Sequence, residues 1–194
     1  MINRTMKQTL VPLALALCLG FAGSAGAAGA KVDKAQKDRI EADYKAAKDH
    51  CKDLKGNAQD ICKVEAKGNY QVAKAELEAQ ADPSPRHDAK VKTEKAQAAY
   101  ELAKEKCDDL NGNAKDVCKK DAKAAFATAK GDAKVAKTSG QTGANSAATQ
   151  SQRKDASDDK LDAQYAAAKE RCDAKSGQAK DDCVNDAKKK FNKM

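Results

Sequence analysis

The sequence predicts an all-α protein made of three repeated antiparallel helical hairpins, each closed by one local disulfide and joined to the next by a flexible linker. Three observations predict this fold. One cysteine-containing string occurs three times, the two cysteines of each copy flank a glycine, and less polar residues recur at helical spacing on both sides of that glycine. The copies begin at Tyr44, Tyr100 and Tyr165 and read YKAAKDHCKDLKGNAQDIC, YELAKEKCDDLNGNAKDVC and YAAAKERCDAKSGQAKDDC.

The composition offers little bulk for a conventional core. Of the 194 residues, 41 are alanine, Trp is absent and there are only two histidines. After the first 30 residues, Val, Ile, Leu and Phe together contribute 16 residues. This is roughly a tenth of the chain, below the roughly one fifth at which an ordinary core becomes doubtful. An enzyme with a buried, preorganised pocket is therefore not expected.

The N-terminal segment, residues 1–30, has the order of a secretory signal peptide. It has two basic residues and no acidic one, then an apolar run over 10–21, then small residues over 22–30. Cleavage can follow either of two A-x-A motifs, at Ala25 and Ala27 or at Ala28 and Ala30. The apolar run of about 12 residues is short for a permanent span, although an uncleaved anchor remains the alternative. We therefore expect a periplasmic protein.

The six cysteines beyond the leader are expected to be oxidised, since their number is even and the chain is exported. In each copy the first cysteine lies five residues before the glycine and the second lies six after it. A continuous helix would separate them by about 16 Å, whereas a disulfide needs α-carbons within roughly 7 Å. The predicted disulfides join Cys51 with Cys62, Cys107 with Cys118, and Cys172 with Cys183. The predicted turns are at Gly56, Gly112 and Gly177, where glycine takes the left-handed conformation that ends a helix.

The residues next to each turn predict how the second helix starts. Asn57 and Asn113 are each followed three residues later by an acid, Asp60 or Asp116, which resembles a capping box. Gln178 replaces the asparagine in the third copy, so its cap is expected to be weaker. Antiparallel arms would also bring aromatic residues level as hydrophobic clasps, pairing Tyr44 with Tyr70, Tyr100 with Phe126, and Tyr165 with Phe191.

Two segments are predicted to be linkers. The stretch 81–88 contains two of the three prolines and should form a bend or tether. The stretch 138–156 contains an uncharged run of small polar residues, which suits a flexible linker that lets the third hairpin move independently. The hairpins themselves are assigned to residues 31–80, 89–137 and 157–194.

The charge pattern favours a solvated helix surface. Removing the leader takes away two of the 37 basic residues and none of the 29 acidic ones, which leaves a net charge of +6. Lysines alternate with acids along each arm, and no basic cluster contains aromatic residues to stack bases. We therefore expect no specific nucleic-acid partner. The most basic stretch, from Asp186 to the end, is the expected place for weak binding to anionic lipid or polymer.

No cofactor or metal site is expected. Structural metal sites bring cysteines two to four residues apart or add histidines, and this pattern does not occur. His50 lies beside Cys51 in the first copy only, where Lys106 and Arg171 take the matching positions. His87 falls in the proline-containing linker and is expected to be solvated. No glycine-rich phosphate loop, nucleophile elbow or metalloprotease motif is present.

A leader followed by YxxAKxxCxxLxGNAxDxC units resembles a group of small exported proteins of β-proteobacteria labelled cell envelope biogenesis protein TolA or TolA-like. The resemblance covers nearly the whole chain, and the paired cysteines around GNAKD, at Cys107 and Cys118, are its most specific part. It implies a cell-envelope role and supplies no catalytic residues.

The leading hypothesis is a non-enzymatic periplasmic protein that serves envelope maintenance or stress tolerance as an interaction module or spacer. Its partners would be envelope proteins or other copies of itself. The alternative is a periplasmic protein that binds metals or polyanions. A redox-active thiol protein is the third possibility.

Overall fold

The computed structural model describes residues 34–193, and the predicted signal peptide lies outside this range. Within it the chain forms helices and no strand. The elements are α1 (Lys34–His50), the short 3-10 helix η1 (Cys51–Asp53), α2 (Gly56–Ala81), α3 (Pro85–Cys107), α4 (Gly112–Thr142), α5 (Ala147–Cys172) and α6 (Gly177–Lys190). The prediction of an all-α fold is confirmed.

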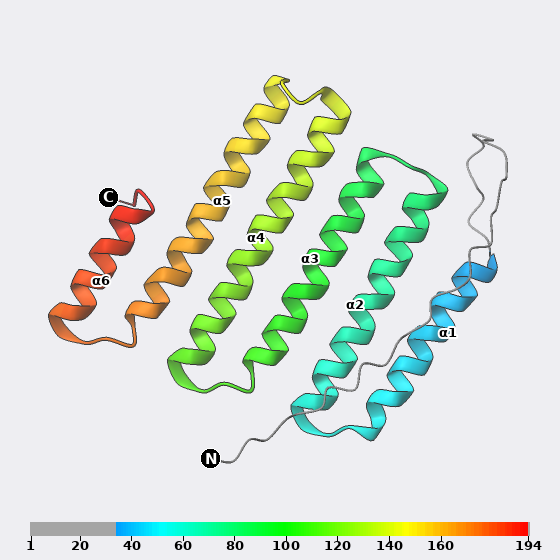
Figure 1. Ribbon diagram of the computed structural model, residues 1–194, viewed down its shortest axis with the longest axis horizontal. Coiled ribbons are helices and arrows are strands. Elements are labelled where there is room, and N and C mark those ends of the chain that lie inside the picture. The colour runs from blue at the N-terminus through cyan, green and yellow to red at the C-terminus, as the bar shows by residue number, and fades with distance from the viewer. Residues whose placement is uncertain (1–33, 194) are drawn as a thin grey trace, which may run out of the picture.

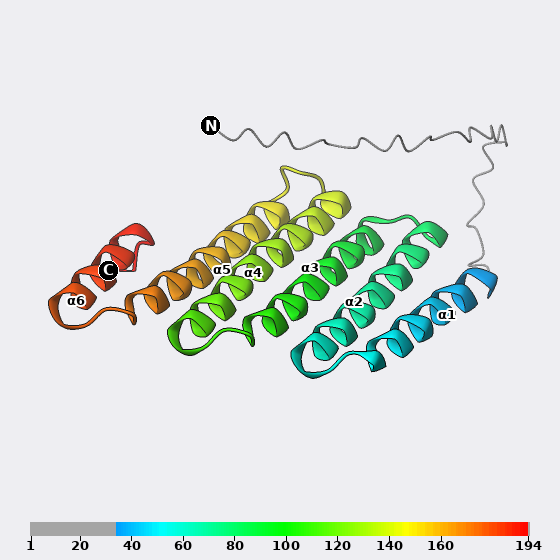
Figure 2. The same ribbon diagram turned by 60° about the horizontal axis from the view of Figure 1, so that its bottom comes forward.

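The helices lie side by side in chain order and form a layer that is one helix thick. Figure 1 shows the row from α1 to α6, and Figure 2 shows the same single row after rotation. Within residues 34–193, each α-helix contacts only the α-helices that precede and follow it in the chain. The predicted hairpins are therefore present, and they also dock against one another.

The connections alternate between the two edges of this layer. The turns that leave α1, α3 and α5 lie at one edge, and the turns that leave α2 and α4 lie at the opposite edge (Figure 1). Because the three hairpin turns with cysteines share one edge, the disulfides lie in a row along it. We call this edge the stapled edge.

The seams between helices are lined by small side chains. The buried residues include eight alanines, namely Ala66, Ala75, Ala89, Ala96, Ala124, Ala133, Ala167 and Ala187. A methyl group at Gly68 of α2 would lie 2.7 Å from Cβ of Ala98 on α3, and one at Gly131 of α4 would lie 2.9 Å from Cβ of Ala156 on α5. Neighbouring backbones therefore approach too closely for larger residues, which explains why an alanine-rich chain can pack without much bulk.

The predicted linker 81–88 contains the predicted bend, at residues 82–84, but the rest of the stretch is helical and forms no tether. Helix α2 continues to Ala81 and α3 begins at Pro85, so that only residues 82–84 connect them. The hydroxyl of Ser84 caps α3 by accepting a hydrogen bond from the backbone N–H of His87 at 3.2 Å. Proline occupies the first helical position, where its missing N–H has no partner to lose. The proline therefore starts a helix after a tight turn.

The predicted flexible linker 138–156 is also largely helical. Helix α4 runs to Thr142 and α5 begins at Ala147, which leaves only residues 143–146 between them. The hydroxyl of Thr149, which is fully buried, donates to the Gly143 carbonyl at 2.8 Å and ties the turn together. Packing of α4 against α3 and α5 outweighs the weak helix propensity of this stretch. The third hairpin is therefore docked against the second along α5.

The close approach at Gly131 predicts the effect of a larger side chain. Replacing Gly131→Leu should lower the free energy of unfolding by about 1 to 3 kcal/mol, although leucine forms helix better than glycine. The matched control is Ala125→Leu on an exposed position of the same helix, which should change stability little. Thermal unfolding followed by circular dichroism measures the stability of both variants. Equal losses of stability would contradict the close approach of α4 and α5 at Gly131.

Candidate functional site at the stapled edge

Three disulfides form, with the predicted pairing. Cys51 joins Cys62, Cys107 joins Cys118 and Cys172 joins Cys183, with α-carbons 5.6, 5.6 and 5.7 Å apart. The first cysteine of each pair is buried, at 1% exposure or less. Each bond links the end of one helix to the first turns of the next, so each hairpin is closed near its tip. Several disulfides in one chain indicate an oxidising compartment, either extracellular or periplasmic.

Glycine shapes each turn by taking positive φ. The angles are +58° at Gly56, +55° at Gly112 and +53° at Gly177, where a side chain would be strained. These glycines begin the second helix of each hairpin, whereas the sequence placed them at the end of the first. The residue before each glycine is extended, so the chain reverses over a few residues.

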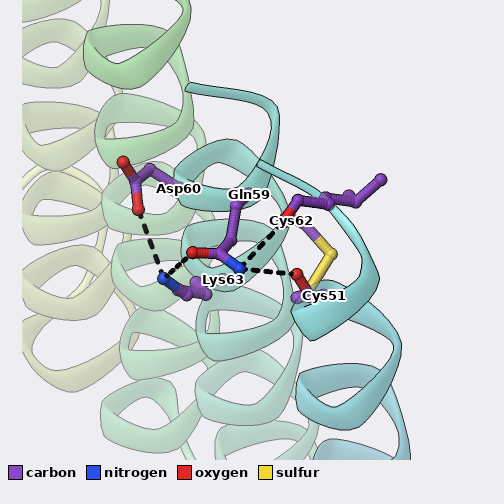
Figure 3. The surroundings of a disulfide bond; sticks show 6 residues. Cys51, Gln59, Asp60, Cys62 and Lys63 are labelled. Carbon is purple, nitrogen blue, oxygen red and sulfur yellow. Dashed lines mark hydrogen bonds and ion pairs between the residues drawn. A yellow bond between two sulfur atoms is a disulfide. The ribbon is translucent and has the colours of Figure 1, made fainter. Parts of the chain in front are cut away.

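In the first hairpin a glutamine ties the turn to the helix that follows. Nε2 of Gln59 donates to the Cys51 carbonyl at 3.2 Å and to the Leu54 carbonyl at 2.9 Å (Figure 3). The ammonium of Lys63 donates to Oε1 of Gln59 at 2.8 Å and lies 3.4 Å from Asp60. The carbonyls of Cys51 and Leu54 in the turn therefore have a side-chain partner next to the disulfide.

The other two hairpins use an ion pair at the matching positions. Asp108 follows Cys107 and accepts from Lys119 at 2.7 Å and Lys115 at 2.9 Å. These two hydrogen bonds, with that from Lys119 the larger, lower the pKa of Asp108 to about 2. In the third hairpin, Asp173 accepts from Lys180 at 2.8 Å, and this hydrogen bond likewise lowers the pKa of the aspartate.

The asparagine that the first two copies share does not cap its own helix, so the capping-box prediction is wrong. Nδ2 of Asn57 on α2 donates to the Glu105 carbonyl of α3 at 2.9 Å. Nδ2 of Asn113 on α4 donates in the same way to the Glu170 carbonyl of α5, also at 2.9 Å. Each asparagine therefore joins its hairpin to the next one at the stapled edge. Each helix starts at the glycine before this asparagine, so the N-cap residues are Lys55 and Asn111, and neither of their side chains forms a capping hydrogen bond.

The third copy differs at this position. Nε2 of Gln178 donates to Oδ1 of Asp182 at 2.8 Å, within α6 itself. Helix α6 contacts α5 alone among the helices of residues 34–193. The substitution of glutamine for asparagine therefore coincides with the one hairpin that has no following hairpin in the described part of the chain. This difference between copies is the sequence signal that could have revealed the cross-hairpin bond.

The aromatic residues meet within each hairpin. The rings of Tyr44 and Tyr70 stack with centroids 4.5 Å apart, and those of Tyr100 and Phe126 stack at 5.0 Å. Tyr165 and Phe191 are tilted with centroids 6.3 Å apart. A lysine ammonium lies over one face of each stacked ring, from Lys48, Lys74, Lys104 and Lys130. Five of these six residues are partly buried, and Phe191 is buried.

Neither histidine joins a cluster of possible metal ligands. Nδ1 of His87 lies 2.6 Å from the carbonyl oxygen of Asp82 in the turn between α2 and α3. His50 is the last residue of α1. Within residues 34–193 there is no group of three or more His, Cys, Asp or Glu side chains arranged to hold a metal ion. In the same range, no helix has the length and apolar character needed to cross a membrane.

Part of the basic C-terminal stretch is held against α5. Lys188, Lys189 and Lys190 form the last turn of α6. Phe191 is buried at 9% exposure, and Lys193 forms an ion pair with Asp162 of α5. The stretch therefore contributes to packing against α5 as well as to the charge of the surface.

The staples should matter most at the end of the row. Replacing Cys172→Ala together with Cys183→Ala removes a loop constraint of about 2 to 3 kcal/mol, and α6 then has only α5 to hold its 14 residues. Hydrogen exchange should show α6 amides losing protection. In the matched pair Cys107→Ala with Cys118→Ala, α3 and α4 should stay protected by their outer neighbours. Equal loss of protection in both variants would contradict this account.

The cross-hairpin bond predicts a difference between two similar substitutions. Asn57→Ala leaves the Glu105 carbonyl without its partner and should lower the free energy of unfolding by about 1 kcal/mol. Gln178→Ala removes only a bond within one helix, for which the loss should be about 0.3 kcal/mol. Urea unfolding measures the free energy of unfolding of the two variants. A larger loss in Gln178→Ala than in Asn57→Ala would contradict the prediction.

The lowered pKa of Asp108 predicts how the turn of the second hairpin responds to low pH. Its pKa is lowered from 3.8 to about 2, so its ion pairs contribute fully above 3.8 and are lost as the pH falls through about 2. Titration of the side-chain carboxyl by NMR should place its midpoint near 2. Replacing Lys115→Gln together with Lys119→Gln should move the midpoint back towards 3.8. An unchanged midpoint in that variant would rule out these lysines as the cause.

Comparison with known proteins gives no relative from which a role could be transferred. No family model, no curated protein and no solved structure matches the chain. The resemblance to proteins labelled TolA-like therefore stays a prediction, and the role of the chain has to be inferred from the chemistry of its own surfaces.

Proposed function

We propose that the chain is a non-enzymatic protein of the periplasm that acts as an interaction module or spacer in envelope maintenance or stress tolerance. The observation that carries this proposal is the single layer of docked hairpins, which leaves both broad faces uncovered by other helices of residues 34–193. A layer of this kind presents much surface for its mass, which suits contact with partners.

The dimensions and contacts of the layer also suit a spacer. Helix neighbours in proteins lie 8–10 Å apart, so six helices in a row hold α1 and α6 about 40–50 Å apart. Because each helix contacts only its chain neighbours, the stability of the row is approximately a sum of local terms. The disulfides keep each hairpin closed even where a seam between hairpins opens.

The periplasmic location combines two supports. The three disulfides indicate an oxidising compartment. The predicted leader and the resemblance to exported envelope proteins narrow this compartment to the periplasm.

A second candidate function is polyanion binding. It is favoured by a row of lysines along one side of α4, namely Lys120, Lys123, Lys130, Lys134 and Lys137. No comparable cluster of ligands favours the metal-binding alternative within residues 34–193.

The interaction role can be tested by cross-linking and affinity capture from the periplasm. The full chain should recover defined envelope partners or other copies of itself. The test variant replaces Asn57→Ala together with Asn113→Ala, which weakens docking between hairpins but leaves every disulfide in place. The proposal expects reduced recovery with this variant. Recovery of no partner under normal or stress growth would contradict the proposal.

A further inference from the structure

From Lys120 onward, helix α4 carries its lysines along one side. Lys123, Lys130, Lys134 and Lys137 are exposed and recur at steps of seven, four and three residues, which places them along one side. Asp132 follows Lys130 by two residues, a rotation of about 200°, and so lies on the opposite side. We call the five lysines from Lys120 to Lys137 the α4 lysine row.

The row borders two grooves on the same face of the layer. The groove between α3 and α4 has a volume of about 350 Å³, and its cations are Arg86, Lys90, Lys130, Lys134 and Lys137. The groove between α4 and α5 has a volume of about 380 Å³ and shares Lys130 and Lys134, so both grooves open on one face. Their acids differ. Glu94 is the acid of the first groove, whereas Asp159 and Asp162 line the second.

Most cations of the first groove have no ion-pair partner. Within residues 34–193, no carboxylate lies within 4.0 Å of Arg86, Lys130, Lys134 or Lys137. Lys90 pairs with Glu78 of α2. The ammonium of Lys130 lies 5.7 Å from the centroid of the Phe126 ring, and the residue is exposed. These four cations are therefore available to an external anion.

We infer that the groove between α3 and α4 binds a linear polyanion that carries phosphates and is one chain wide. Along α4, the distance from Lys130 to Lys137 is about 10 Å at 1.5 Å per residue. Arg86 supplies charge from the α3 side of the groove, where Lys90 is already paired with Glu78. A single anionic strand lying along the groove would therefore meet cations on both sides, above a floor of small residues such as Ala89 and Ala133.

The groove between α4 and α5 indicates that the partner is a single polyanion chain rather than a flat anionic surface. A bilayer laid on this face would cover the α4 lysine row together with Asp159, whose charge opposes binding, and Asp162, which is paired with Lys193. A strand confined to the first groove meets only Glu94. The inference rests on the second candidate function above and adds the place and the class of partner.

Binding of short, end-labelled linear polyphosphate to the full oxidised chain tests this site. The groove variant combines Lys130→Gln, Lys134→Gln and Lys137→Gln. The control combines Lys92→Gln, Lys106→Gln and Lys160→Gln, three exposed lysines that line no part of this groove and carry the same total charge. The groove variant should bind roughly tenfold or more weakly than the control. Its slope of log affinity against log salt should fall by about 2, at about 0.7 per neutralised phosphate.

Equal weakening of both variants would overturn the site, since it would show a general effect of charge. Failure of the wild-type chain to bind polyphosphate would overturn it too. Vesicles of phosphatidylcholine and phosphatidylglycerol provide a further arm. If they bind the wild-type chain more tightly than polyphosphate does, and the groove variant loses that binding, the partner is a membrane and the inference is wrong. None of these failures affects the module role, which the capture experiment tests separately.

Discussion

The close approach of helix backbones across seams of alanine and glycine is the constraint on which the rest of the structure depends. A chain with so few large apolar residues gains little from any one buried side chain, so it packs through many small contacts along long helices. The small side chains of such a seam pack only when the two helices are already held side by side. The disulfides hold the two helices of a hairpin in that position, and docking between hairpins then extends the same packing across the layer. The packing of small residues and the local disulfides therefore stabilise the layer together.

The bond from asparagine to the next hairpin gives the layer a direction. Asn57 and Asn113 each reach forward to the last turn of the following odd-numbered helix, and Gln178 turns back onto its own helix. Repeat arrays commonly carry altered residues in their terminal units, where the docking face has no neighbour. Within residues 34–193, Gln178 lies in the hairpin that no other hairpin follows. The matching position on the α1 side of the layer is Asp49, two residues before its cysteine as Glu105 and Glu170 are before theirs.

The local architecture could be read from the sequence, but the assembly of hairpins could not. The spacing of Cys51 and Cys62 around a glycine allows only a bent chain, so pairing and hairpin follow from geometry. The stretch 138–156 was predicted as a linker because its composition favours flexibility, yet docking against α3 and α5 makes most of it helical. Gly68 and Ala98 lie in an alanine-rich background where no pattern marks them as partners. Asn57 matched a local capping motif while its true acceptor lies 48 residues away.

Three disulfide-closed hairpins form one extended layer, and the distance between its two outer helices tests this arrangement most directly. Spin labels carried by noncanonical residues at Lys45 of α1 and Lys189 of α6 leave the native disulfides intact, and pulsed electron paramagnetic resonance then measures their separation. A row of six helices predicts one narrow distribution centred at about 40–50 Å. A narrow distribution near the width of a compact bundle, about 20 Å or less by the same spacing, would contradict the layer. A broad distribution, as expected of hairpins on loose tethers, would contradict the docking between them.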